Sequence, residues 1–156
     1  MGKALNTLKS RNGDAIFFIF IIVFVIITLS AIIIEYFRIE SMYQQVEYEL
    51  QRGANSSVEY AMLDEYRRDG TAKMDTALAE EALYSYLHES MKLDQTLKKK
   101  FKGKSVYELE LQCITTTDTP PQLTITGLII TRSTFSFLTG EIKLPFTISS
   151  SNNRID

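Results

Sequence analysis

The strongest pattern in the chain is a run without formal charge from Ala15 to Ile34, made mostly of Ile, Phe, Val and Leu. As an α-helix, this run would extend roughly 30 Å, which is the thickness of the hydrocarbon core of a bilayer. A secretory signal has a shorter apolar region followed by two small residues at a cleavage site, and Ala31 is the one small residue near this boundary. We therefore predict a transmembrane helix over residues 14–36, preceded by a basic leader over residues 1–13.

Beyond this span, apolar and small residues recur at steps of three and four, which marks one face of an α-helix. No proline interrupts the chain before Arg68, so we predict one continuous helix of about 50 residues, whose outer part covers 37–68. Arg67 to Thr71, with Gly70, are typical of a helix end and a loop. The predicted face consists of Ile39, Met42, Tyr43, Val46, Leu50, Gly53, Ala54, Ser57 and Ala61.

Three residues of this face, Gly53, Ser57 and Ala61, form a stripe of small side chains at four-residue spacing. Such a stripe lets another backbone approach closely. Two interpretations remain open, because the stripe could pack against the chain's own globular domain or against a helix of a neighbouring subunit. We take these three residues as candidates for helix packing or assembly.

A second helix is predicted to follow. Asp75 or Thr76 can cap its N-terminus, and the pattern predicts that it fades near Lys98, with Gly103 marking its end. The lysines from Lys98 to Lys104 would then solvate the end of this helix, where cations suit the helix dipole. One side of the helix would carry Leu83, Tyr86, Leu87 and Met91.

From Ser105 the apolar period falls to two, as in strands with one buried face. VYELELQC would bury alternate residues that end with Cys113, and QLTITGLIITR would form a second strand with a bulge at Gly127. STFSFLTGEIKLPFTIS is typical of a hairpin that turns near Thr139 and Gly140. One arm would carry Phe135 and Phe137, and the other would carry Ile142, Leu144, Phe146 and Ile148. Because Pro145 lacks a backbone donor, the last strand would be an edge strand or would have Pro145 on its outward side.

These elements predict an α+β fold, in which a long N-terminal transmembrane helix continues into the ectodomain. A second helix and a small antiparallel sheet of three or four strands form the domain over residues 75–150, and residues 151–156 form a polar tail. The outer part of the long helix is the nearest cover for the apolar face of the sheet.

Composition restricts the function further. The 156 residues carry a net charge of −2, and the one lysine cluster gives little support for nucleic-acid binding. The lone cysteine, Cys113, cannot form an internal disulfide and is predicted to be a small buried hydrophobe. The lone histidine, His88, has no second imidazole for a metal or nucleophile pair, and no GxSxG motif occurs. We predict no catalytic residue, metal or cofactor, and no enzyme.

Charges flanking the span predict its orientation. Lys3, Lys9 and Arg11 precede it and are opposed by Asp14. Since positive residues stay on the cytoplasmic side, the N-terminus is expected in the cytoplasm and the C-terminal domain outside it.

The basic leader ends at Gly13 and runs from Asp14 directly into the apolar helix, which has Glu35 and Tyr36 near its outer end and continues into YQQVEYELQRGA. In these features the N-terminal part, less than half of the chain, resembles the TadE-like pseudopilins of the tight-adherence pilus system, a type IV pilin-like family. The resemblance implies a pilin-like fold and cleavage between Gly13 and Asp14 by a prepilin peptidase. It also implies membrane lipid and other pilin-like subunits or envelope-complex proteins as partners.

One position departs from the family. The mature chains usually carry a glutamate at their fifth residue, and cleavage after Gly13 would place Phe18 there. A carboxylate in hydrocarbon costs several kcal/mol unless it is paired, so its absence removes an assembly contact from the span. A minor, initiating or membrane-resident role is then favoured over a major pilin, with Asp14 as a substitute charge near the interface.

Glu35 has two interpretations: an acid at the level of the outer headgroups, or a partner for a basic group on an adjacent subunit. Tyr36 and Phe37 beside it suit an interfacial aromatic belt. Two functions therefore remain. One is a structural pilin-like subunit in the membrane or in a cell-surface pilus, and the other is a permanently anchored single-pass protein whose outer domain binds a partner in an envelope complex.

Overall fold

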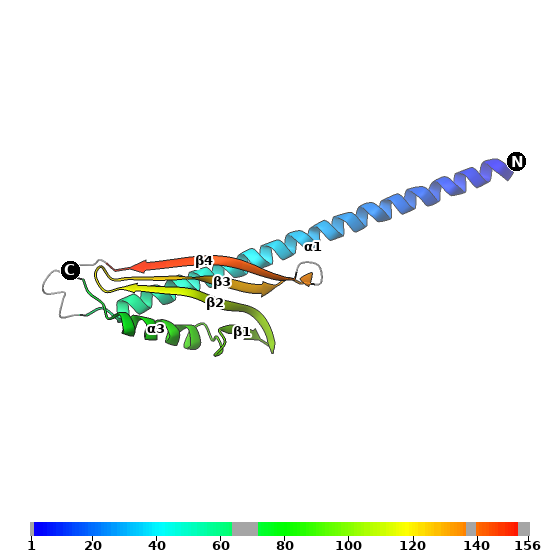
Figure 1. Cartoon of the computed structure of the whole chain (residues 1–156). Coiled ribbons are helices and arrows are strands. Elements are labelled where there is room, and N and C mark those ends of the chain that lie inside the picture. The colour runs from blue at the N-terminus through cyan, green and yellow to red at the C-terminus, as the bar shows by residue number, and fades with distance from the viewer. Residues whose placement is uncertain (1, 64–71, 137–139, 153–156) are drawn as a thin grey trace. The chain divides into compact units, whose positions relative to one another are not determined.

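The computed structural model describes residues 2–63, 72–136 and 140–152, with side chains from Ala15 onward. The fold is α+β, and the chain divides into two compact units, residues 1–40 and 41–156. The elements are α1 (Gly2–Tyr60), α3 (Thr76–Glu89), β1 (Lys98–Phe101), β2 (Lys104–Thr117), β3 (Gln122–Arg132) and β4 (Glu141–Ser151) (Figure 1).

The first unit is the N-terminal part of α1. Its most apolar stretch has a mean hydropathy of 3.3 and none of it is buried inside the protein, which is compatible with a single-pass membrane protein. The hydroxyls of Thr28 and Ser30 donate hydrogen bonds of 2.8 Å to the carbonyls of Phe24 and Ile26. These two polar groups are therefore satisfied within the helix, as a hydrocarbon surrounding requires. The helix begins at Gly2, so the backbone of the predicted leader is helical as well.

The C-terminal end of α1 lies earlier than the sequence predicts. The helix ends at Tyr60, so the prediction of a helix through Arg68 was wrong. The chain turns instead into a short pairing, in which the amide of Leu63 donates to the carbonyl of Lys73 at 3.0 Å. The amide of Asp75 donates to the carbonyl of Ala61 at 2.9 Å. These bonds hold the chain in place after the helix, and the predicted stop at 67–71 lies outside the described residues.

The second helix, α3, has the predicted start, because the Asp75 carboxylate caps it by accepting from the amides of Ala77 and Leu78. It ends at Glu89, so the predictions of an end near Lys98 and of Gly103 as its stop were wrong. A positive φ of 55° at Lys92 and a turn at Asp94 lead the chain away from the helical path. The lysine-rich segment then forms β1, and Gly103 belongs to the turn before β2. The buried residues on α3 are Ala79, Leu83 and Leu87, and Met91 is buried just beyond its end.

The four strands form one antiparallel sheet in the order β1-β2-β3-β4 (Figure 1). The second predicted strand coincides with β3, and the edge position of β4 with an exposed Pro145 is confirmed. Phe135 lies in a turn after β3, so its predicted place on a strand was wrong. The arm that pairs with β4 is β3 itself. Phe137 and Thr139 lie outside the described residues, and Gly140, with a φ of 68°, precedes β4.

A β-bulge in β2 corrects the prediction for Cys113. Opposite β3, the register passes from Leu111 paired with Gly127 to Cys113 paired with Thr126, which leaves Gln112 as the extra residue. A bulge reverses the alternation of side chains beyond it. The face that buries Tyr107 and Leu109 is therefore not the face of Cys113, which is exposed. The predicted bulge at Gly127 lies instead on the opposite strand.

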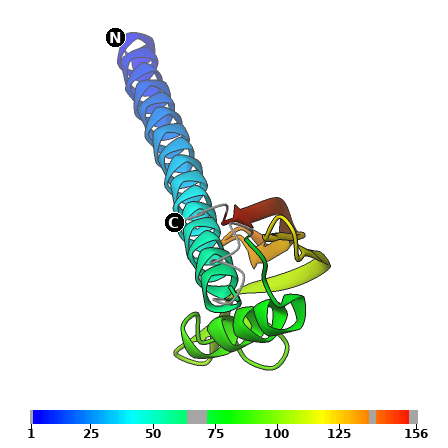
Figure 2. The same cartoon turned by 90° about the vertical axis from the view of Figure 1, so that its left-hand side faces the viewer.

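The core of the second unit lies between the sheet and two helices. The part of α1 from residue 41 onward runs along the sheet in both views (Figures 1 and 2). The Tyr43 hydroxyl donates to the carbonyl of Pro145 at 3.1 Å, and the Gln51 amide donates to the carbonyl of Ser149 at 3.1 Å. The predicted cover of the sheet is thus confirmed. The core includes Val46, Leu50, Ala54 and Val58 from α1, Leu83 and Leu87 from α3, and Leu109, Leu123, Ile125, Ile129, Phe146 and Ile148 from the sheet.

Candidate functional site

The predicted processing position lies in helical backbone, because Gly13 and Asp14 are both within α1. A peptidase that cuts between them must open the helix locally. Glycine is about 1 kcal/mol less favourable than alanine inside a helix, so Gly13 makes this local opening easier. Gly13 is therefore a weak point of the helix at the predicted processing position.

The predicted assembly carboxylate, Glu35, is paired within its own helix. Arg38 donates to it twice, from Nη2 to Oε1 at 2.7 Å and from Nε to Oε2 at 3.0 Å. Glu35 is only 9% exposed, and such a two-bond pair is the strong form of a carboxylate–guanidinium contact. Beside it, the exposed rings of Tyr36 and Phe37 meet edge to face with centroids 5.8 Å apart. This arrangement suits the interfacial end of a span.

The small-residue stripe is buried in the second unit. Gly53, Ser57 and Ala61 are all covered, and the Ser57 hydroxyl donates to the carbonyl of Gly53 at 2.8 Å. A Cβ added to Gly53 would lie 2.6 Å from Cδ1 of Tyr86 on α3. At Gly53 the close contact is therefore made by α3 of the same chain. This agrees with the interpretation that the stripe packs against the chain's own globular domain.

We expect the substitution Gly53→Leu to destabilise the second unit by about 1 to 3 kcal/mol, because the new side chain overfills the contact with Tyr86. The control is Arg52→Leu, at an exposed position on the same turn, which should change stability by less than about 0.5 kcal/mol. The measurement is thermal unfolding of the full chain in detergent micelles, followed by the near-ultraviolet circular dichroism of tyrosine. Equal melting temperatures for the two variants would argue against this close contact.

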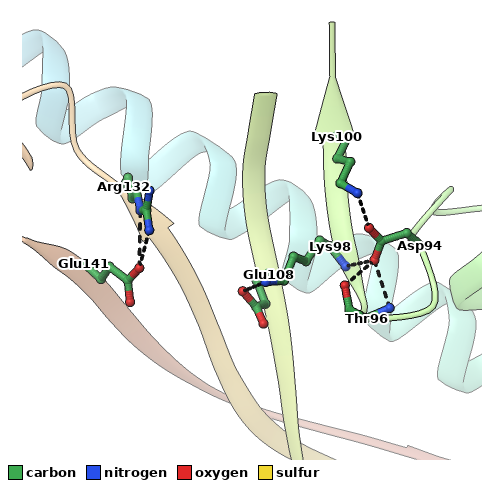
Figure 3. A network of polar contacts seen from close by, with 7 residues as sticks. All are labelled: Asp94, Thr96, Lys98, Lys100, Glu108, Arg132 and Glu141. Atoms are coloured by element: carbon green, nitrogen blue, oxygen red, sulfur yellow. Dashed lines mark hydrogen bonds and ion pairs between the residues drawn. The ribbon is translucent and has the colours of Figure 1, made fainter. Parts of the chain in front are cut away.

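A network of charged residues crosses one end of the sheet (Figure 3). Lys98 on β1 pairs with Glu108 on β2 at 3.0 Å, and Arg132 on β3 pairs with Glu141 on β4 at 2.9 Å. Both pairs join residues that stand directly opposite each other in the register. The hydrogen bond from Arg132 lowers the pKa of Glu141. Opposite charges at such positions favour this register over a shifted one, so the network is structural.

The same network contains the turn before β1. One carboxylate oxygen of Asp94 accepts from the amide of Thr96 at 2.9 Å, from its hydroxyl at 2.7 Å and from the amide of Lys98 at 3.0 Å. The other oxygen pairs with Lys100 at 2.7 Å (Figure 3). The bond from Lys100, followed by those from the backbone of Lys98 and from Thr96, holds the pKa of Asp94 well below its usual range.

This pKa predicts how stability depends on pH. A carboxyl group whose pKa is lowered by folding stabilises the protein above its unfolded pKa, near 3.9, and this contribution is lost as the pH falls toward the folded value. We expect Asp94→Asn to lower the melting temperature at pH 7, and the difference from the wild type to shrink between about pH 5 and pH 2.

Asp118→Asn is the control for this measurement, since the Asp118 carboxylate approaches Lys73 only to 3.9 Å. The melting temperature of Asp118→Asn should differ little from that of the wild type, both at pH 7 and over the acidic range. A constant difference between Asp94→Asn and the wild type across this pH range would contradict the role of the ionised carboxylate.

Two residue types with catalytic potential, histidine and cysteine, occur once each in the sequence, at His88 and Cys113. His88 is exposed, with Nδ1 3.2 Å from the carbonyl oxygen of Leu93, and Sγ of Cys113 lies 3.5 Å from the hydroxyl of Thr115. Within residues 2–63, 72–136 and 140–152, no group of three or more His, Cys, Asp or Glu could hold a metal ion. That the chain is not an enzyme stays a prediction.

Comparisons of the chain with models of protein families, with curated proteins and with solved structures found no match. The resemblance to TadE-like pseudopilins therefore rests on the sequence features of the N-terminal part.

Proposed function

We propose that the chain is a pilin-like structural subunit, a minor pilin or pseudopilin, of a bacterial pilus or secretion-type envelope assembly, and that it acts through its N-terminal helix. The observation that carries the proposal is the double character of α1. Residues 15–34 are apolar and unburied, whereas Val46, Leu50, Ala54 and Val58 of the same helix belong to the core of the second unit.

This double character matches what such a subunit needs. In a bilayer, an all-round apolar segment contacts lipid, and in an assembly the same segment can be covered by the helices of other subunits. The small α+β unit then supplies the surface outside the membrane. Lys3, Lys9 and Arg11 favour a cytoplasmic N-terminus and an extracytoplasmic C-terminal domain. The subunit needs neither a cofactor nor a catalytic group for this function.

The absence of a carboxylate at position 18 favours a minor or initiating subunit within this proposal. Phe18 can contribute to apolar helix packing but cannot pair with the terminal amine of a neighbour. If a prepilin peptidase cuts after Gly13, Asp14 becomes the first residue and carries the nearest negative charge. This charge would lie at the membrane interface, where it costs less than within the hydrocarbon.

A second function is favoured by the pairing of Glu35 with Arg38 on the same helix. A carboxylate that already has a guanidinium partner gives a neighbouring subunit less electrostatic attraction. Together with Phe18, this pairing supports a permanently anchored single-pass protein whose outer domain binds a partner in an envelope complex. In that case the span serves as an anchor and the partner contacts lie on the second unit.

The two functions predict different neighbours for two parts of the chain, which site-specific photo-crosslinking in native cells can separate. Phe24 in the span, and Tyr60 and Tyr84 in the second unit, are exposed aromatic residues that a benzoyl-phenylalanine crosslinker can replace with little change of shape. For a pilin-like subunit, we expect the crosslinker at position 24 to capture a second copy or another single-pass subunit.

The opposite pattern would contradict the proposal. Lipid adducts alone at position 24, together with protein adducts at position 60 or 84, would support the permanently anchored protein. The control is a strain that lacks the other assembly genes. Crosslinks at position 24 that arise from random collision would persist in that strain.

A further inference from the structure

The largest cluster of positive charge in the sequence lies around β1. The segment from Lys92 to Lys104 carries six lysines and one acid, Asp94, in a chain whose net charge is −2. The span ends near Ile34, so this segment lies far beyond the 15 to 20 flanking residues that set membrane orientation. The positive-inside rule therefore does not account for the charge of this segment.

An aromatic side chain stands at the tip of this segment. Phe101 is 67% exposed, with the ammonium group of Lys102 5.6 Å from the centre of its ring. Phe101 pairs with Lys104 across a turn of two residues, Lys102 and Gly103, which both have positive φ, at 49° and 79°. Such turns favour asparagine or glycine, so a lysine here has a conformational cost. We call residues 100–104 the hairpin tip.

Lys99 donates to the carbonyl of Met91, and four of the other lysines divide into two groups by their partners. Lys98 and Lys100 are paired with Glu108 and Asp94, at 3.0 Å and 2.7 Å. Over the described parts of the chain, Lys102 and Lys104 have no carboxylate within ion-pair distance, and both are exposed. The hairpin tip thus presents an exposed ring together with two exposed lysines that lack a carboxylate partner.

The tip lies beside the part of α1 that follows the span most closely along the chain. A cavity of about 300 Å³ is lined by Phe101 and Lys99 together with Met42 and Val46 of α1. Met42 is only eight positions beyond Ile34. Whatever angle the two units adopt, this stretch of chain spans at most about 28 Å when fully extended and about 12 Å as a helix.

We infer that the hairpin tip binds the surface of the membrane in which the chain is anchored, with Lys102 and Lys104 on anionic lipid headgroups and Phe101 at the interface. Phenyl rings and lysines are the residue types that amphipathic surface contacts combine, and each lysine near an anionic surface strengthens binding about fivefold. The tip is a two-residue turn with exposed side chains at Phe101, Lys102 and Lys104. The inference requires the span to lie in a bilayer but does not depend on assembly with other subunits.

The absence of tryptophan from the chain makes a direct test possible. Phe101→Trp places a single fluorophore at the tip, and Tyr84→Trp, at an exposed position on α3, is the matched control. Each full-length variant is reconstituted alone into vesicles of phosphatidylcholine, with or without phosphatidylglycerol, that contain lipids brominated close to the headgroup. Bromine quenches tryptophan fluorescence at short range, so quenching reports contact with the interface.

We expect stronger quenching and a blue shift for Phe101→Trp than for Tyr84→Trp, and only in vesicles with phosphatidylglycerol. Adding Lys102→Gln and Lys104→Gln should reduce the ratio of bound to free tips by roughly 25-fold. Salt at 1 M, where the Debye length is about 3 Å, should have the same effect.

Three results would overturn the inference. They are equal quenching in both variants, quenching that is independent of anionic lipid and of the lysines, and a blue shift that grows with protein density instead of with anionic lipid. The last result would assign the tip to a contact with a second copy. Because no other subunit is present, each of these results leaves the proposed role in assembly untouched.

Discussion

Replacing Gly127 by alanine is expected to destabilise the second unit by about 3 kcal/mol or more. A Cβ added at this position would lie 2.3 Å from the carbonyl oxygen of Glu110 and 3.0 Å from the ring of Phe146. The first of these atoms belongs to the backbone of β2 beside the bulge, so the strand itself would have to move. Inside a strand alanine is otherwise more favourable than glycine by about 0.5 to 1 kcal/mol. The collision therefore reverses the sign of the substitution.

Gly103→Ala provides the matched control for Gly127→Ala. Gly103 has a φ of 79° and open space around its Cα, so its substitution tests conformation without collision. A cost of about 1 to 2 kcal/mol is expected there. Melting temperatures of the full chain in micelles, from the near-ultraviolet circular dichroism of tyrosine, compare the two. A Gly127→Ala variant as stable as the wild type would contradict the close approach of β3 to the bulge.

Leu50→Ala is expected to cost about 3 to 5 kcal/mol, because it removes a fully buried side chain at the contact between α1 and the sheet. Leu50 is 0% exposed and belongs to the same core as Ile125 and Phe146. For a domain of this size, such a loss corresponds to a fall in melting temperature of roughly 12 °C or more. The helicity of residues 15–34 should remain, since these residues belong to the other unit.

The control for this effect is Tyr48→Ala on the same stretch of α1, where the side chain is exposed. Its effect should stay within about 0.5 kcal/mol. Equal effects of the two substitutions would show that this part of α1 is not packed in the core. Amide hydrogen exchange over residues 41–60 checks the same point, because loss of the core contact should raise exchange there more than in residues 15–34.

The elements that the sequence predicted well are those whose signals are local. The apolar run of residues 15–34, the cap at Asp75 and the alternation over Gln122–Arg132 each depend on spacing within a few residues, and all three occur in the structure. The face of α1 that packs on the sheet was also predicted at Val46, Leu50 and Ala54, which recur at a spacing of four, whereas Val58 of the same core was not named. Periodicity alone carries these predictions.

The elements that were missed depend on partners distant in sequence. β1 has the sequence KKKF, which shows no apolar alternation, and it becomes a strand by pairing with β2 across the hairpin tip. Lysines on an edge strand oppose pairing with another chain. From the sequence alone, their charge was interpreted as the solvated end of a helix. The bulge at Gln112 leaves no mark in the pattern of VYELELQC, because the room for it comes from Gly127 on the next strand.

For the candidate site, the sequence named the right residues more readily than their contacts. Glu35 and Arg38 are three residues apart, a spacing at which helical side chains meet, so their pairing was available from the sequence but was not considered. The contact of Gly53 with Tyr86 joins two helices, and the stripe alone left two interpretations open, packing on the chain's own domain or on a neighbouring subunit. The hairpin tip was missed for the same reason as β1.

The N-terminal residue of the protein taken from its native membrane is the measurement that tests the central claim most directly, by terminal sequencing combined with intact mass. A chain that begins at Asp14 is the result that the pilin-like proposal predicts, since cleavage after Gly13 precedes assembly in the family that it resembles. A chain that retains Lys3, Lys9 and Arg11 would contradict this claim, and α1 would then serve as a permanent anchor.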